Sequence, residues 1–164
     1  TQALAEAVDI PVIASGGVVT GADIKRVLDA GAAGVQMGSR FAATQESSAG
    51  EKFKQMYVDA TEDDIVLIQS PVGLPGRALR NPFTRMLEEG DVPRIERCIT
   101  CLKKCGRDFC IMDKLTRVQE RDDVEGGLVF AGSSAARIHD IPSVAELMDR
   151  LVTEFGAATG GAAT

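Results

Sequence analysis

Short apolar runs alternate with an amphipathic stretch in the first third of the chain. Residues 10–14 (IPVIA) and 34–38 (GVQMG) predict two short strands, and the wholly apolar first run is typical of a parallel strand buried on both faces. Apolar residues at helical spacing predict a helix from about Gly21, with Thr20 and Asp23 in a capping box at its start. Strand, helix and strand in this order form a βαβ unit, which is the repeat of a parallel α/β fold.

The pattern becomes less regular after this unit. We predict helices over 50–60, over 83–89 and from Ser143 to Gly156, short strands over 65–68 and 127–130, a loop rich in glycine and proline over 70–82, and a disordered tail over 157–164. Two or three parallel strands cannot close a barrel, so we expect the partner strands to precede Thr1 in a longer protein. The expected domains are barrel units over 1–85 and an extension over 86–156, followed by the tail.

Both strands of the βαβ unit end in a turn that contains glycine. Gly16-Gly17 follows the first strand and Gly38-Ser39 follows the second. Glycines allow backbone N–H groups to face phosphate oxygens without a Cβ in the way, and Ser39 adds a hydroxyl group. In (β/α)8 barrels a phosphate site is often built from the loops after strands 7 and 8. A purely structural role for the turns is the alternative, but two consecutive turns at one edge favour a shared phosphate.

Composition and charge restrict the class of protein. A hydrophobic content of 45% is enough to build a core, and a net charge of −6 argues against a general nucleic-acid binder. No apolar run approaches the roughly 20 residues that span a bilayer, and no secretory signal is visible. We therefore expect a cytoplasmic protein that binds neither nucleic acid nor membrane.

Four cysteines, Cys98, Cys101, Cys105 and Cys110, lie close together, and the chain has no others. Four thiols are the number that ligates an iron–sulfur cluster or a structural zinc, so these residues are candidate metal ligands. Their spacing matches neither the usual zinc pairs nor the ferredoxin run. Free thiols in a short helical segment, with Cys101, Leu102 and Cys105 on one face, are the alternative, and disulfides are less favoured in a reducing compartment.

Residues 10–47 (IPVIASGGVVTGADIKRVLDAGAAGVQMGSRFAATQES) resemble the FMN-phosphate segment of the nitronate monooxygenases, once called 2-nitropropane dioxygenases. IMP dehydrogenases have a similar segment, but residues 57–83 (YVDATEDDIVLIQSPVGLPGRALRNPF) are similar to the nitronate monooxygenase pattern. The resemblance implies that Ser39 stands where threonine is the commoner residue. It also implies that the FMN-binding residues are those of the two turns and of the second strand, namely Gly16, Gly17, Gln36, Met37, Gly38 and Ser39.

The same resemblance implies the C-terminal part of a (β/α)8 TIM barrel with a helical, cysteine-containing extension. The full-length protein would be an FMN-dependent oxidoreductase that oxidises a small-molecule substrate, a nitronate, with O2. The resemblance implies that the family's catalytic histidine belongs to an N-terminal half that this sequence lacks, and His139 matches no family motif, so no catalytic residue is assigned. Gly132-Ser133-Ser134 is a further candidate for backbone amides near the flavin.

Two alternatives to this function stay open. One is an FMN-dependent enoyl-ACP reductase, which shares the fold and the phosphate segment. The other is a non-catalytic fragment that acts as a metal-binding or interaction module. We expect the isolated chain to be inactive, and poorly soluble or assembled as a homo-oligomer, because a half barrel leaves strand edges open.

Overall fold

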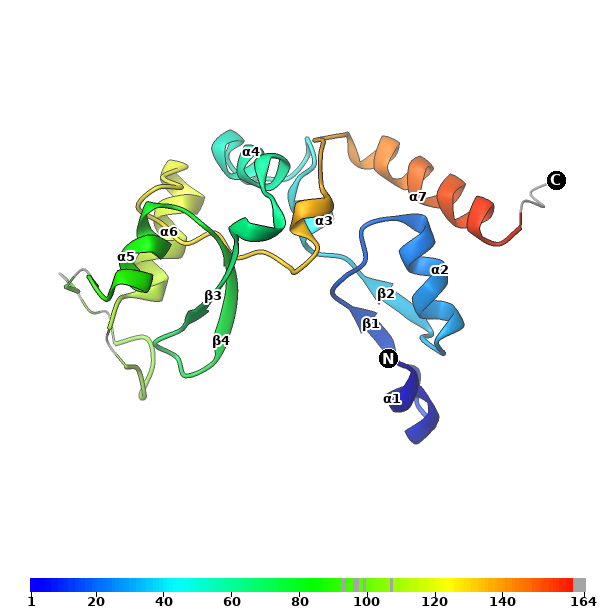
Figure 1. Cartoon of the computed structure of the whole chain (residues 1–164), viewed down its shortest axis with the longest axis horizontal. Coiled ribbons are helices and arrows are strands. Elements are labelled where there is room, and N and C mark those ends of the chain that lie inside the picture. The colour runs from blue at the N-terminus through cyan, green and yellow to red at the C-terminus, as the bar shows by residue number, and fades with distance from the viewer. Residues whose placement is uncertain (93, 96–97, 99, 107, 161–164) are drawn as a thin grey trace.

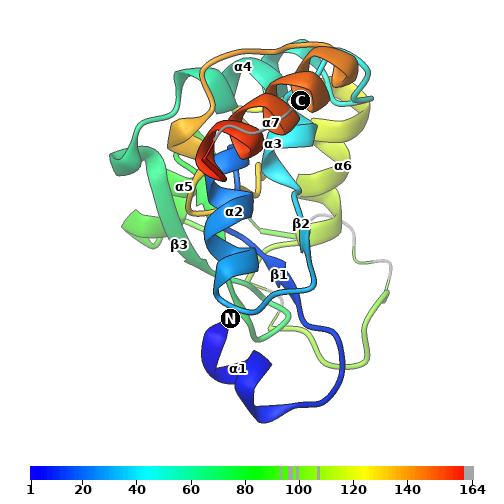
Figure 2. The same cartoon turned by 90° about the vertical axis from the view of Figure 1, so that its right-hand side faces the viewer.

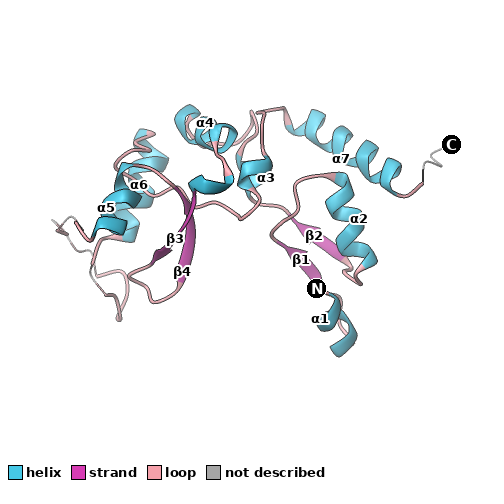
Figure 3. Cartoon of the chain, viewed as in Figure 1, coloured by secondary structure: helices cyan, strands magenta, loops and turns pink. Residues whose placement is uncertain are grey.

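A computed structural model describes residues 1–92, 94–95, 98, 100–106 and 108–160. The fold is mixed α/β, with two separate pairs of strands (Figure 3). None of the helices in the described part of the chain combines the length and the apolar character that a membrane span requires. The elements are α1 (Gln2–Ala7), β1 (Ile13–Ser15), α2 (Gly21–Asp29), β2 (Gly34–Gln36), α3 (Ser39–Ala42), α4 (Glu51–Asp59), β3 (Ile65–Gln69), β4 (Pro75–Leu79), α5 (Pro82–Glu89), α6 (Ile111–Arg121) and α7 (Val144–Ala158), with short 3-10 helices at Glu62–Asp64 and Ala135–Arg137.

The elements form two groups joined through α3 and α4 (Figure 1). One group holds β1, β2, α2 and α7, and α7 lies alongside α2 (Figure 2). The other holds β3, β4, α5 and α6. β1 pairs in parallel with β2, with Ala14 opposite Val35, whereas β3 pairs antiparallel with β4, with Leu67 opposite Arg77. The predicted βαβ unit is therefore confirmed.

Local signals in the sequence located most of the helices. The capping box of Thr20 and Asp23 opens α2, and that of Ser143 and Glu146 opens α7, as predicted. The predicted helices over 50–60 and 83–89 correspond to α4 and α5. α7 continues through Gly156 to Ala158, so the start of the predicted disordered tail is helical, while residues 161–164 lie outside the described residues.

The first strand is less buried than its apolar sequence indicates. Ile10 is 72% exposed and Ile13 is 57% exposed, whereas Ala14 is buried. The prediction of burial on both faces is therefore wrong for this chain, because its helices cover only one face of the β1–β2 pair.

The prediction of a loop over 70–82 is wrong for residues 75–79. Residues 75–79 form β4, and Pro75 occupies the first position of the strand, where the missing N–H is tolerated. The hairpin turn contains Gly73 at φ +92°, in the left-handed region that favours glycine. The strand predicted over 65–68 is confirmed as β3, but it is antiparallel and is not a third strand of the parallel sheet.

The described part of residues 86–156 also departs from the predicted elements. The strand predicted over 127–130 is reduced to one bridge between Phe130 and Ala78. α6 was not predicted, and the described residues of 98–106 form no helix. One buried cluster nevertheless joins distant segments of the chain, because Val19, Tyr57 and Val118 belong to it with Ala43, Ala60, Leu79, Val129, Ala135 and Ile138.

α2 and α7 approach each other most closely at Gly21. A Cβ at this position would lie 2.3 Å from the carbonyl oxygen of Leu151 and 2.3 Å from the backbone nitrogen of Phe155. The N–H of Gly21 also donates to Glu154 Oε2 at 2.7 Å. Glycine is therefore required by the packing of the two helices.

Asp23 holds the loop between β1 and α2 in place. Its carboxylate accepts hydrogen bonds from the N–H groups of Val19 and Thr20 and forms ion pairs with Arg26 and Arg137. Burial by itself raises the pKa of Asp23, but the hydrogen bonds from Val19, Arg137 and Thr20 outweigh burial and lower that pKa to about 2.

The helix contact predicts the effect of Gly21→Ala. The added methyl group meets backbone atoms that cannot rotate away, so we expect a loss of about 1–3 kcal/mol in the free energy of unfolding. Gly156→Ala is the matched control, because this glycine lies within α7 and its Cβ would meet no atom within 4 Å. Urea unfolding should show Gly156→Ala to be neutral or stabilising, and equal effects of the two changes would contradict the contact.

The low pKa of Asp23 predicts the effect of Asp23→Asn on stability against pH. A carboxylate whose folded pKa is depressed stabilises the fold above its unfolded pKa, and this stabilisation is lost as the pH falls toward the folded value. We expect the variant to lose about 2 kcal/mol at pH 7, and the difference from wild type to shrink between about pH 4 and pH 2. Asp29→Asn, which breaks only the pair with Lys25 on the same helix, should change stability little. If Asp23→Asn lowered the free energy of unfolding by the same amount at every pH, the low pKa of Asp23 would not be the cause of the stabilisation.

Candidate phosphate-binding site

The register of β1 and β2 brings the two glycine turns together. Ser15 lies opposite Gln36, so Gly16-Gly17 and Gly38-Ser39 leave the same edge of the parallel pair. This is the arrangement that the sequence predicts for a shared phosphate, and it places both turns at the carboxyl ends of their strands.

No atom of the described residues covers the backbone of either turn in the direction in which a side chain would point. Gly16 and Gly17 have φ values of +86° and +73°, which L side chains rarely adopt. A Cβ built at Gly16, Gly17 or Gly38 would meet no atom within 4 Å. A ligand can therefore approach the peptide groups of these residues closely.

Several backbone amides of the two turns remain available. Within the described part of the chain, the N–H groups of Gly16, Gly17, Gly38 and Ser39 donate to no backbone or side-chain acceptor. The carbonyl of Gly17 accepts from Arg26 at 3.4 Å, and the guanidinium adds positive charge beside the loop. Free amides beside a positive charge suit an anion such as a phosphate group.

The two remaining predicted residues differ in their surroundings. Gln36 is exposed at the end of β2, where its amide can contact a ligand next to the turns. Met37 is half-buried, and it lines an apolar groove of about 470 Å³ with residues of α2, α3 and α7, among them Leu28, Phe41 and Phe155. The side chain of Met37 is thus engaged by the helices, and its backbone is what continues into the second turn.

Ser39 belongs to a network that the sequence did not reveal. Its Oγ accepts a hydrogen bond from the N–H of Gly132 at 3.0 Å, which brings the candidate segment 132–134 to the edge of the site. The buried Tyr57 donates its hydroxyl hydrogen to the carbonyl of Phe130. Burial raises the pKa of Tyr57 to about 12, while a hydrogen bond from Ser39 acts in the opposite direction. Because a backbone carbonyl far along the chain is the partner of Tyr57, no sequence motif marks this residue.

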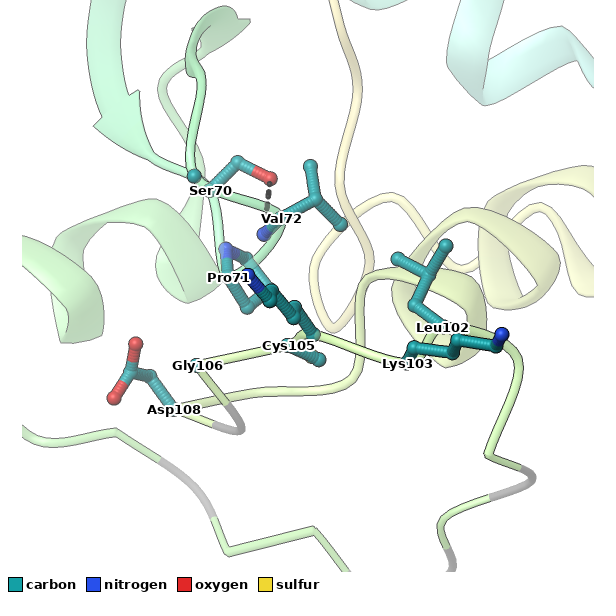
Figure 4. Close-up of a pocket in the computed structure, with 10 residues that line it drawn as sticks. Ser70, Pro71, Val72, Leu102, Lys103, Cys105, Gly106 and Asp108 are labelled. Carbon is teal, nitrogen blue, oxygen red and sulfur yellow. Dashed lines mark hydrogen bonds between the residues drawn. The ribbon is translucent and has the colours of Figure 1, made fainter.

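A second, open cavity lies between the β3–β4 turn and the cysteine segment (Figure 4). Its volume is about 790 Å³, and Ser70, Pro71 and Val72 face Lys103 and the neighbouring residues across it. The N–H of Gly106 donates to the carbonyl of Pro71 at 2.7 Å and so ties the two segments together. The cavity has a polar, partly cationic lining.

The four cysteines are all free, and three of them are exposed, with Cys110 half-buried at the start of α6. Cys98, Cys101, Cys105 and Cys110 do line one small cavity of about 30 Å³. Yet among the described residues no three His, Cys, Asp or Glu side chains are grouped so as to hold a metal ion. The described residues thus give no support to the predicted zinc or iron–sulfur site, which stays a prediction, as does the alternative of free thiols.

The chain is similar to known proteins along most of its length. The family model described as nitronate monooxygenase matches residues 1–154. An indene-carboxyl-CoA dehydrogenase of Mycobacterium tuberculosis, (3aS,4S,5R,7aS)-5-hydroxy-7a-methyl-1-oxo-octahydro-1H-indene-4-carboxyl-CoA dehydrogenase, is 29% identical over 88% of this chain and 49% of its own length.

Two solved structures extend the likeness to the fold. The M276A mutant of FabK from Thermotoga maritima has a TM-score of 0.76 and 31% identity over 96% of this chain and 46% of its own. A nitroalkane oxidase from Streptomyces ansochromogenes has a TM-score of 0.71 and 27% identity over 94% of this chain and 42% of its own. The chain thus spans about half the length of these relatives. With the family model matching nearly all of its length, the chain belongs to the nitronate monooxygenase family.

Proposed function

We propose that this chain is the FMN-phosphate-binding part of an FMN-dependent oxidoreductase. The observation that carries the proposal is the pairing of β1 with β2, which places two open glycine turns with free amides at one edge. Membership of the nitronate monooxygenase family supports flavin as the bearer of that phosphate.

The residues present fit the phosphate end of FMN. The amides of Gly16, Gly17, Gly38 and Ser39 would bind the phosphate oxygens, and Gln36 would contact the adjoining part of the cofactor. FMN, when bound, supplies the redox chemistry of the enzyme. The role of this chain is to bind and orient the cofactor. Asp23 contributes by holding the loop that carries Gly16-Gly17.

We further propose that the β1–β2 pair is part of a (β/α)8 barrel. The exposed side chains of Ile10 and Ile13 and the unpaired outer edges of a two-stranded parallel sheet call for further strands. Strands of this kind are normally covered on both faces. The relatives are about twice as long as this chain, which leaves room in a protein of their length for the further strands of a barrel.

The proposed reaction is the oxidation of a nitronate by O2. The family model and the similarity to a nitroalkane oxidase support it. The second candidate is an FMN-dependent enoyl-ACP reductase, which the similarity to FabK favours. The relative whose name specifies a CoA thioester also favours an acyl-thioester substrate.

Visible spectroscopy and substrate tests on the full-length gene product separate these candidates. Bound flavin should give absorption bands at about 370 and 450 nm. Oxygen uptake with a nitronate and without nicotinamide would support the first reaction. Bleaching of the flavin by NAD(P)H with turnover of an enoyl thioester would support the second, and a colourless protein that takes up no FMN would contradict both.

Gly38→Ala tests whether the phosphate occupies the space in front of the second turn. The φ of Gly38 is −100°, which alanine adopts freely, and the added Cβ meets no protein atom. The variant should fold as well as wild type. A bound phosphate would collide with the methyl group, so we expect the Kd for FMN to rise at least about tenfold, which is roughly 1.4 kcal/mol. Titration with riboflavin, which lacks the phosphate, is the control, and its Kd should not change. Unchanged FMN affinity would place the phosphate elsewhere.

A further inference from the structure

Residues 129–132 connect the two groups of elements that Figure 1 shows. On the hairpin side, the N–H of Leu79 donates to the carbonyl of Val129 at 2.9 Å, and the N–H of Ala131 donates to that of Arg77 at 3.1 Å. The segment therefore runs beside β4 like a short extra strand. Contacts on the opposite side of residues 129–132 therefore also fix the position of the β3–β4 hairpin relative to the two glycine turns.

Two hydrogen bonds hold residues 130–132 on the side that faces away from β4. Tyr57, at 3% exposure, donates to the carbonyl of Phe130, and the N–H of Gly132 donates to Ser39 Oγ. The hydroxyl of Tyr57 is therefore linked to Ser39 Oγ through the backbone of residues 130–132.

We propose that Tyr57 is a positioning residue for the phosphate site, acting through Ser39 and residues 130–132. The inference rests on the proposed function, since the ligand concerned is FMN. The backbone amide of Ser39 binds the phosphate, while its side chain is held by the N–H of Gly132. Loss of the phenol hydroxyl releases the carbonyl of Phe130 and, with it, residues 130–132 and their contact with Ser39. The amides of the second turn then lose their fixed direction and FMN affinity falls.

Tyr57→Phe tests the proposal in the flavin-free, full-length gene product, titrated with FMN and with riboflavin. The change keeps the buried ring and removes only the hydroxyl. The Kd for FMN should rise on the order of 3- to 10-fold, as the loss of one hydrogen bond predicts. The Kd for riboflavin should stay the same, because the phosphate end is absent. Ser39→Ala should give a similar rise, and the double variant should add little to the larger single effect.

Phe53→Leu is the control for a merely structural role. The ring of Phe53 packs 5.1 Å from that of Tyr57 on the same helix, but it is outside the hydroxyl network. This variant should lower Tm and leave the ratio of the two Kd values unchanged. If wild type prefers FMN while Tyr57→Phe keeps the same ratio, or if the Tyr57 and Ser39 changes add independently, the positioning role is wrong. If wild type does not prefer FMN to riboflavin, the proposed function itself fails.

Discussion

The parallel pairing of β1 with β2 is the constraint on which the rest of the site depends. Parallel strands require a crossover connection, here α2, and they bring their carboxyl ends to one edge. A shift of the register by one residue would exchange the two faces of each strand and move one turn relative to the other. The open amides at Gly16-Gly17 and Gly38-Ser39 converge only because this register is kept.

The surrounding contacts keep both turns in place from outside the sheet. Asp23 ties the segment that follows the first turn to α2 and to Arg137. α7 packs on α2 at Gly21, and the buried Arg40 joins the segment after β2 to Asp140. Arg137, Asp140 and α7 therefore support the site, even though they lie far beyond β1 in the sequence.

Local signals allowed much of this to be predicted from the sequence. The capping boxes at Thr20 and Ser143 and the glycine turns after two apolar strands depend on neighbouring residues, so they survive in a single sequence. β4 was missed because glycine and proline suggest a loop, while the strand is stabilised by pairing with β3. Tyr57 was missed for the same reason, since its partner Phe130 is distant in sequence and contributes only a carbonyl. The role of the four cysteines stays a prediction, since among the described residues no three His, Cys, Asp or Glu side chains are grouped so as to hold a metal ion.

A crystal structure of the full-length gene product with FMN bound would show directly where the phosphate lies. We expect phosphate oxygens within about 3 Å of the amides of Gly17, Gly38 and Ser39, with Ser39 Oγ still accepting from the N–H of Gly132. A phosphate bound elsewhere, or turns whose amides are occupied by the protein's own carbonyl groups, would contradict the proposed site.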